Sequence, residues 1–183
     1  MGLEAGTVNI HADIIERCRQ GDRDAYYQLY KLYSKSMYNI GYRIVNNEDE
    51  AEDVLQEAFI SAFRNLDHYR GDATFGSWLK RIVVNKAINV LKTRKAERLP
   101  EDENFDLQEE VWPETEFPFT VQQVRNAMEE LPAGYRSVLS LYLMEGYDHS
   151  EIAEILGISE STSKSQFNRS KKKLREILEG GKV

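Results

Sequence analysis

A cluster of basic side chains near the end of the chain is suited to binding the phosphates of nucleic acid. Its members are Lys164, Arg169, Lys171, Lys172, Lys173 and Arg175. The residues before it predict a short amphipathic helix, whose apolar positions are Ile152, Ala153, Ile155 and Leu156. Gly157 permits the positive φ of a tight turn, Ile158 can fill that turn, and Ser159 can cap a second helix. This order predicts a helix-turn-helix that reads DNA with its basic second helix.

The basic second helix is predicted to have two faces. The face toward the core consists of Ser163, Phe167, Ser170 and Leu174. The face that points away consists of Ser161, Ser165, Asn168 and Lys172, with Lys164 and Arg169 beside it. Asn168 or Arg169 can read base edges in a major groove, while the lysines fix the helix on phosphate.

A second basic helix is predicted far upstream, from Phe75 to about Lys95, with basic residues continuing to Arg98. One stripe of this helix consists of Trp78, Arg81, Asn85, Asn89 and Lys92. The neighbouring stripe, expected to be buried, consists of Leu79, Ile82, Val83 and Val90. Amides read base edges, cations pair with phosphates and an aromatic ring stacks on an unpaired base, so the first stripe suits nucleic acid. An ordinary solvated face fits the same spacing.

The loop before this helix, Asp67 to Thr74, contains Tyr69, Arg70, Gly71 and Asp72. A donor-rich side chain, a flexible glycine and short polar groups can form a pocket for a flipped or single-stranded base. The alternative is a plain turn in which Thr74 or Ser77 caps the helix.

An acidic helix is predicted to begin at Asn47, with Glu50 as the partner of a capping box. Its buried stripe consists of Ala51, Val54, Leu55, Ala58, Phe59 and Ala62. The opposite face consists of Asp53, Gln56, Glu57, Ile60 and Arg64. An isoleucine ringed by carboxylates suggests a protein partner with a basic rim, although a solvated face with one stray apolar residue is the alternative.

The periodic segments predict an all-α fold with two small helical domains joined by an acidic flexible linker. The first domain covers residues 1–97 and includes a helix at about Arg23–Val45, with its apolar stripe at Ala25, Leu29, Leu32, Ile40 and Ile44. Residues 98–119 form the linker, which carries three prolines and eight acids. Residues 120–183 form the second domain, with helices at Val121–Leu131 and Tyr135–Met144 before the helix-turn-helix.

The net charge of −7 is uneven, because 99–119 and 48–57 hold many acids and no base. Outside these two segments both basic helices are strongly positive, as a DNA-binding protein requires. The acidic linker can act as a nucleic-acid mimic or as a solvated spacer.

No catalytic or metal-binding pattern is found, so we expect no enzyme, no cofactor and no metal. His11, His68 and His149 stand apart, and the single cysteine, Cys18, is expected to be a small core residue. The stretch Gly2–Asp13 lacks a secretion signal, and no apolar run is long enough to span a bilayer, which predicts a cytoplasmic protein without membrane insertion.

Two blocks of motifs resemble the extracytoplasmic-function (ECF) sigma factors of bacterial RNA polymerase. The block similar to region 2 comprises Asn47–Phe59, Phe63–Leu66, Tyr69–Gly71, Phe75–Leu79 and Arg81–Asn85. The block similar to region 4 comprises Leu131–Leu139, Glu151–Ile158 and Thr162–Ser165. Gln166 stands where many relatives have a cation, and Ser163 and Ser170 replace small apolar residues, so promoter specificity at −35 is not carried over.

The resemblance implies binding sites and partners. The acidic helix would dock on core RNA polymerase through Asp53, Gln56, Glu57, Ile60 and Arg64. The −10 promoter element would be melted and bound by Tyr69, Arg70, Gly71, Asp72, Thr74, Trp78, Arg81, Asn85, Asn89 and Lys92. The −35 element would be bound by Thr162, Lys164, Ser165, Asn168, Arg169 and Lys172. An anti-sigma factor is implied as a further partner.

Two other functions are compatible with parts of the sequence. One is a stand-alone helix-turn-helix regulator whose N-terminal half senses a ligand or dimerises. The other, an enzyme fused to a DNA-binding module, is disfavoured because no catalytic constellation is found. Two outward recognition faces in the N-terminal half favour a sigma factor over a sensor, which would need a pocket.

Overall fold

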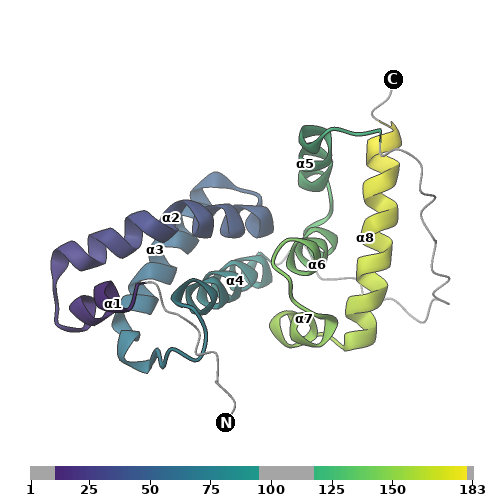
Figure 1. Cartoon of the computed structure of the whole chain (residues 1–183). Coiled ribbons are helices and arrows are strands. Elements are labelled where there is room, and N and C mark those ends of the chain that lie inside the picture. The colour runs from purple at the N-terminus through teal and green to yellow at the C-terminus, as the bar shows by residue number, and fades with distance from the viewer. Residues whose placement is uncertain (1–10, 95–117, 181–183) are drawn as a thin grey trace, which may run out of the picture. The chain divides into compact units, whose positions relative to one another are not determined.

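The computed structural model describes residues 11–94 and 118–180 (Figure 1). These residues form eight α-helices and one short 3-10 helix and no strand, which confirms the all-helical class. The chain divides into two compact units, Met1–Val90 and Leu91–Val183. Apart from Pro118 and Phe119, the predicted linker 98–119 lies outside the described residues, as does the end of the upstream basic helix from Lys95 to Arg98.

The first unit is built from helices whose ends follow local capping rules. They are α1 (Ala12–Arg19), α2 (Arg23–Val45), α3 (Glu48–Arg64), the 3-10 helix η1 (Leu66–His68) and α4 (Phe75–Thr93). Asp22 caps α2 by accepting from the backbone N–H of Asp24 at 2.9 Å. Asn47 caps α3 by accepting from Glu50 N–H at 3.0 Å, which places the start of α3 where the sequence predicts it.

The core of the first unit contains every apolar residue predicted to be buried in α3. Cys18 is also buried, and burial raises the pKa of its thiol to about 11, so it is a protonated core residue. The prediction for α2 is wrong at Leu32, which is 51% exposed. Four residues after Leu29, Tyr33 takes the inward position instead, and its ring lies 5.3 Å from that of Phe75. The buried stripe therefore drifts past Leu32.

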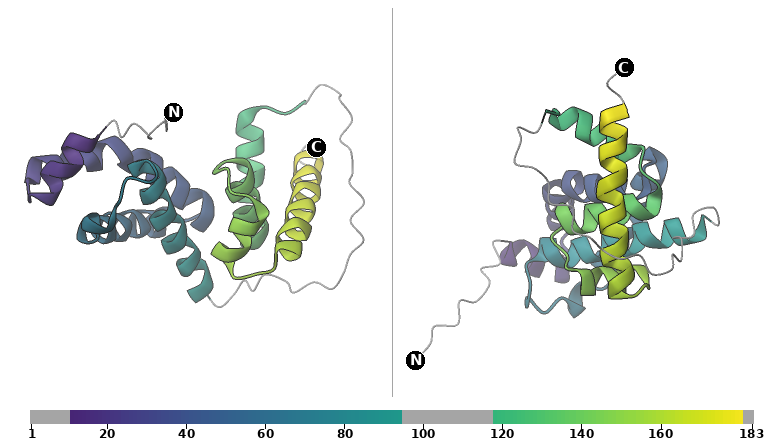
Figure 2. Two further views of the ribbon diagram at one scale, coloured as in Figure 1. Left: turned by 60° about the horizontal axis from the view of Figure 1, so that its bottom comes forward. Right: turned by 90° about the vertical axis from the view of Figure 1, so that its right-hand side faces the viewer.

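In the second unit, three shorter helices lie against the long α8 (Figures 1 and 2). The helices are α5 (Val121–Glu129), α6 (Ala133–Leu143), α7 (His149–Leu156) and α8 (Glu160–Gly180). One cluster of the core consists of Met128, Leu131 and Leu139, with Val124, Phe167, Leu174 and Ile177 packed against it. The C-terminal half of α8 is thus anchored by apolar contacts to α5 and α6.

The turn between α7 and α8 has the geometry that the sequence predicts. Asp148 and Glu151 form a capping box at the start of α7. Gly157 ends α7 with a φ of 73°, in the left-handed region. Ser159 then accepts a hydrogen bond from Thr162 N–H at 3.0 Å and caps the first turn of α8. The caps and the turn of the helix-turn-helix are therefore formed by residues that lie close together in the sequence.

Candidate nucleic-acid and protein interfaces

The outer face of α3 is exposed and carries two carboxylates, an amide and a cation around one apolar residue. Asp53, Gln56, Glu57 and Arg64 are all exposed, and Ile60 retains 49% of its accessible surface. Lys86 of α4 forms an ion pair with Glu57 at 3.2 Å, and both side chains face water, so the pair contributes little to stability. The five predicted residues therefore share one accessible face, with an apolar side chain at its centre.

The loop between η1 and α4 is organised around Tyr69, which is only 4% exposed. The Tyr69 hydroxyl donates a hydrogen bond to Ala73 O at 2.6 Å and so closes the loop on itself. Its ring packs against Phe75 and Trp78, with centroids 5.6 and 5.3 Å away. Burial raises the pKa of the Tyr69 hydroxyl, which remains a proton donor at neutral pH. Tyr69 thus forms the frame of the loop.

The other predicted loop residues lie at the surface. Arg70, Asp72 and Thr74 are exposed, and Gly71 has a φ of 82° that a larger residue adopts only with strain. Thr74 Oγ1 accepts from Ser77 N–H at 3.2 Å, so the predicted cap of α4 is present.

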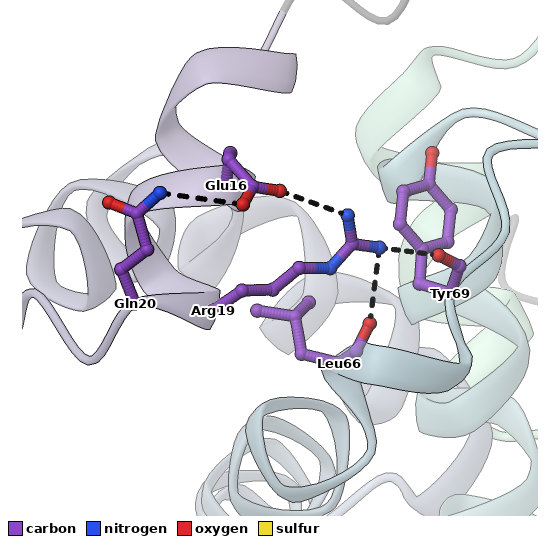
Figure 3. A network of polar contacts seen from close by, with 5 residues as sticks. All are labelled: Glu16, Arg19, Gln20, Leu66 and Tyr69. Carbon is purple, nitrogen blue, oxygen red and sulfur yellow. Dashed lines mark hydrogen bonds and ion pairs between the residues drawn. The ribbon is translucent and has the colours of Figure 1, made fainter.

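Sequence inspection missed a side chain that reaches this loop from α1. Arg19 Nη2 donates to Tyr69 O at 2.6 Å and to Leu66 O at 3.4 Å (Figure 3). These partners lie 50 and 47 residues away along the chain. No short-range signal in the sequence could have paired them, because the contact exists only once α1 and η1 are packed together.

The predicted polar stripe of α4 is present as one accessible surface. Arg81, Asn85, Asn89 and Lys92 are exposed, while Trp78 is half-buried beside Tyr69. On the other side of the helix, Leu79, Val83, Val84, Ala87 and Ile88 are buried. The helix therefore presents two amides outward, with a cation on either side of them along the stripe.

In α8, the predicted DNA-facing residues lie between Thr162 and Lys172. Lys164 and Lys172 are exposed, and Thr162, Ser165, Asn168 and Arg169 are half-buried. Lys164 also forms an ion pair with Glu160, at 2.7 Å, one turn earlier. This surface pair is weak enough for phosphate to replace the carboxylate.

Two inward positions of α8 are buried: Ser163, as the sequence predicts, and Gln166, for which the sequence analysis gave no orientation. Gln166, which stands where many relatives have a cation, is 1% exposed. It follows Ser163 by three residues and precedes Ser170 by four, a spacing that could have placed it on the inner face. Ser163 is fully buried, and its Oγ lies 2.9 Å from His149 Nδ1 of α7. The His149 ring stacks on Tyr142 at 4.6 Å and meets Phe167 edge-on at 5.6 Å. This ring cluster joins α6, α7 and α8.

The described residues hold neither a metal-binding cluster nor a membrane-spanning helix. Among residues 11–94 and 118–180, no group of three or more His, Cys, Asp or Glu side chains is arranged to hold a metal ion. Within the same two stretches, no helix has the length and apolarity needed to cross a membrane.

Comparisons with known proteins match both units. Residues 29–97 match the family model for Sigma-70 region 2, and residues 121–174 match that for Sigma-70, region 4. The ECF RNA polymerase sigma factor SigW of Bacillus subtilis is 31% identical over 179 residues, which cover 90% of this chain and 94% of SigW. The ECF RNA polymerase sigma-E factor of Escherichia coli is 34% identical over 171 residues, covering 86% of this chain and 88% of that protein.

Solved structures of two complexes contain chains with a similar fold. The complex of the sigma factor RpoE with the anti-sigma factor NepR from Bartonella quintana contains a chain with a TM-score of 0.56 and 23% identity. That match covers 84% of this chain and 96% of the other. A chain in the complex of CnrH with the cytosolic domain of CnrY has a TM-score of 0.54 and 21% identity, covering 92% and 96% of the two chains.

Proposed function

The chain belongs to the ECF RNA polymerase sigma factors, and we propose that it binds core polymerase and selects promoters through three separate surfaces. In this proposal, residues 1–97 hold the polymerase-binding and −10-binding surfaces, 98–119 form a linker, and 120–183 hold the −35-binding surface. The observation that carries the proposal is the coexistence of an acidic face with an apolar centre and two basic, amide-bearing faces. A stand-alone repressor needs only one such DNA-binding face.

The outer face of α3 is proposed to bind core polymerase. Ile60 would enter an apolar depression of the partner, and the burial of its exposed half would contribute most of the affinity. Asp53 and Glu57 would face basic residues at the rim, where charges set the rate and orientation of association. Gln56 and Arg64 complete the polar ring around Ile60.

The loop and the α4 stripe are proposed to bind the melted −10 element. Arg70, Asp72 and Thr74, which are exposed, would contact one extruded base, and Gly71 lets the backbone turn beside them. Tyr69 acts by supporting this loop from inside. Along α4, Arg81 and Lys92 would contact phosphates, while Asn85 and Asn89 would contact base edges. Trp78, half-buried at the start of the stripe, is the candidate for stacking on an unpaired base.

The part of α8 from Thr162 to Lys172 is proposed to enter the major groove at the −35 element. Asn168 and Arg169 are the candidates for base contacts, and Thr162, Lys164, Ser165 and Lys172 for phosphate contacts. Separate recognition of −10 and −35 by two units gives a specificity that is the product of the two, provided both engage one promoter.

The proposal assigns no bond-making step to this chain, because polymerase itself joins nucleotides. It places the protein in the cytoplasm, where polymerase and chromosome lie. It also includes an anti-sigma factor as a partner, since relatives of this fold are found in complexes with such proteins.

The test is transcription with purified bacterial core polymerase on fragmented genomic DNA, followed by mapping of RNA 5′ ends. The expected result is a small set of reproducible start sites that share sequences near −10 and −35 and that vanish without the protein. Absence of specific initiation, together with tight binding of the free protein to a duplex operator, would support the repressor instead. Separate fragments 1–97 and 120–183 serve as controls, because accurate initiation by either one alone contradicts the two-site mechanism.

A further inference from the structure

We propose that Arg19 is a positioning residue for capture of the −10 base, acting through the loop between η1 and α4. This inference rests on the proposed function of that loop. Arg19 is the last residue of α1 and lies outside the part of the chain that matches the region 2 model, which begins at residue 29. Its guanidinium nevertheless reaches the point at which the loop begins.

The contacts of Arg19 fix its guanidinium from two sides (Figure 3). On the α1 side, Nη1 meets Glu16 Oε2 at 3.3 Å, and the other Glu16 oxygen accepts from Gln20 Nε2 at 3.4 Å. On the loop side, Nη2 donates to Tyr69 O at 2.6 Å and more weakly to Leu66 O at 3.4 Å. A planar guanidinium can serve both sides at once, which a lysine ammonium on a shorter reach cannot do as well.

The hydrogen bond to Tyr69 O has a direct consequence for the loop. It holds the backbone of Tyr69, while the Tyr69 hydroxyl holds the far end of the loop at Ala73 O. The residues between these two points, Arg70 to Asp72, are therefore carried on a short arch with both ends fixed. A charge-assisted hydrogen bond is stronger than a neutral one, so Arg19 firmly restrains the start of this arch.

A fixed arch matters because extruding a base from a duplex is costly. The unpaired and unstacked base is stabilised only if its pocket exists when it arrives. If the arch must be ordered at that moment, the ordering entropy is added to the cost of opening. Loss of Arg19 should therefore weaken capture of the base without affecting the α3 face, where Ile60 lies.

The test compares Arg19→Ala with Arg17→Ala. Arg17 is a matched control from the same helix, since its guanidinium bonds Asp22 at the α1–α2 turn rather than the loop. Three quantities are measured for each full-length variant: core affinity, thermal midpoint, and the fluorescence of 2-aminopurine placed in the −10 element of a mapped promoter. For Arg19→Ala we expect base extrusion to fall by about tenfold, the value of one charged hydrogen bond. The core affinity and the thermal midpoint should equal those of Arg17→Ala. Amide hydrogen exchange in residues 70–74 should accelerate in Arg19→Ala alone.

Further variants separate failure of this inference from failure of the proposed loop function. Arg19→Lys should recover part of the extrusion, because one carbonyl contact can be rebuilt. The double variant Arg70→Ala with Asp72→Ala removes side chains of the arch itself. If this double variant is impaired while Arg19→Ala equals Arg17→Ala, the positioning role is wrong and the loop function stands. If Arg19→Ala loses core affinity and thermal stability as well, its role is merely structural. Normal extrusion by the double variant would overturn the function of the loop itself.

Discussion

Both units use an arginine to hold backbone carbonyls at the end of a helical segment, but the two arginines act over different distances in sequence. In the first unit, Arg19 holds Tyr69 O from 50 residues away. In the second unit, Arg136 at the start of α6 donates to Leu131 O at 2.7 Å, only five residues away. The contact between arginine and carbonyl is therefore a tertiary contact in the first unit and a local contact in the second.

This difference extends to the proposed DNA-binding surfaces. The turn before α8 is set by Asp148, Gly157 and Ser159, all within a dozen residues of one another. The loop before α4 requires α1, η1 and the packed ring of Phe75 to be in place. A locally encoded surface can form as soon as its own helices form, whereas the −10 surface depends on the whole first unit.

The largest effect is expected where the first unit meets polymerase. Ile60→Glu should lower core affinity by about 2 kcal/mol or more, roughly 30-fold in Kd, because a carboxylate would be forced into an apolar contact. Stability should hardly change, since the side chain is 49% exposed. Binding of labelled protein to core measures the affinity, and thermal unfolding checks the fold.

Leu32→Glu is the matched control for Ile60→Glu. Leu32 is an apolar side chain of the same unit, 51% exposed and outside every proposed surface. The Leu32→Glu variant should therefore bind core polymerase with the affinity of the parent chain. Equal core affinity of the two variants would remove the α3 face from the polymerase interface.

The next largest effect concerns the α4 stripe. Arg81→Ala combined with Asn85→Ala should reduce promoter opening by about tenfold or more, since one phosphate contact and one base contact are lost. Core binding should persist. Permanganate reactivity of unpaired thymines measures the opening. Gln28→Ala with Lys31→Ala removes an amide and a cation from an exposed part of α2, and it should leave opening unchanged. If the two double variants open promoters equally well, the α4 stripe is only a solvated face.

The local or tertiary origin of each feature decides what the sequence could predict. The start of α3, its six buried residues and the Gly157 turn follow from capping rules and helical period, and the structure confirms each one. The prediction that Leu32 is buried was wrong, because the apolar stripe of a long helix drifts around its axis. Tyr33 takes the inward position instead.

Pairings across the fold were out of reach of such reasoning. The contact of Arg19 with Tyr69, and that of His149 with Ser163, join residues that share no pattern until the helices pack. The burial of Tyr69 was likewise missed, because a loop tyrosine beside an arginine and a glycine has the composition of an exposed turn. Which residues touch DNA or polymerase remains a prediction.

A smaller effect tests the local origin of the second unit. Gly157→Ala should destabilise this unit by about 1–2 kcal/mol, because an alanine at a φ of 73° is strained. Gly180→Ala, in α8 with open space around it, is the control and should not destabilise. With Trp112→Phe in the background, Trp78 fluorescence reports the first unit alone, since the chain has two tryptophans. In Gly157→Ala, the urea midpoint measured by Trp78 fluorescence should be unchanged. The midpoint measured by circular dichroism, which reports both units, should fall. A parallel shift of both signals would mean that the units do not unfold independently.

The smallest effect is a pH dependence confined to the second unit, where His149 links α7 to α8. Burial, and then the charge of Lys164, lowers the pKa of His149, while Glu160 and Asp148 act in the opposite direction. The folded state therefore binds this proton less readily than the unfolded chain, in which the pKa is about 6.5. The contribution of His149 to stability is complete above that pH and is lost progressively as the pH falls from there through the lower pKa of the folded state. The second unit should weaken on acidification below about pH 6.5.

The variant His149→Phe with Ser163→Ala isolates this effect from the titration of carboxylates. Phenylalanine keeps a ring against Tyr142 and Phe167, and alanine removes the buried hydroxyl that would otherwise lose its partner. Urea unfolding followed by circular dichroism is compared between about pH 5 and 8 for the variant and the parent chain. The parent should lose more stability than the variant over the acidic half of this range, and Trp78 fluorescence should show no such difference. Identical pH profiles would mean that His149 remains neutral throughout or gains a compensating charge partner, and the joint between α7 and α8 would then be insensitive to pH.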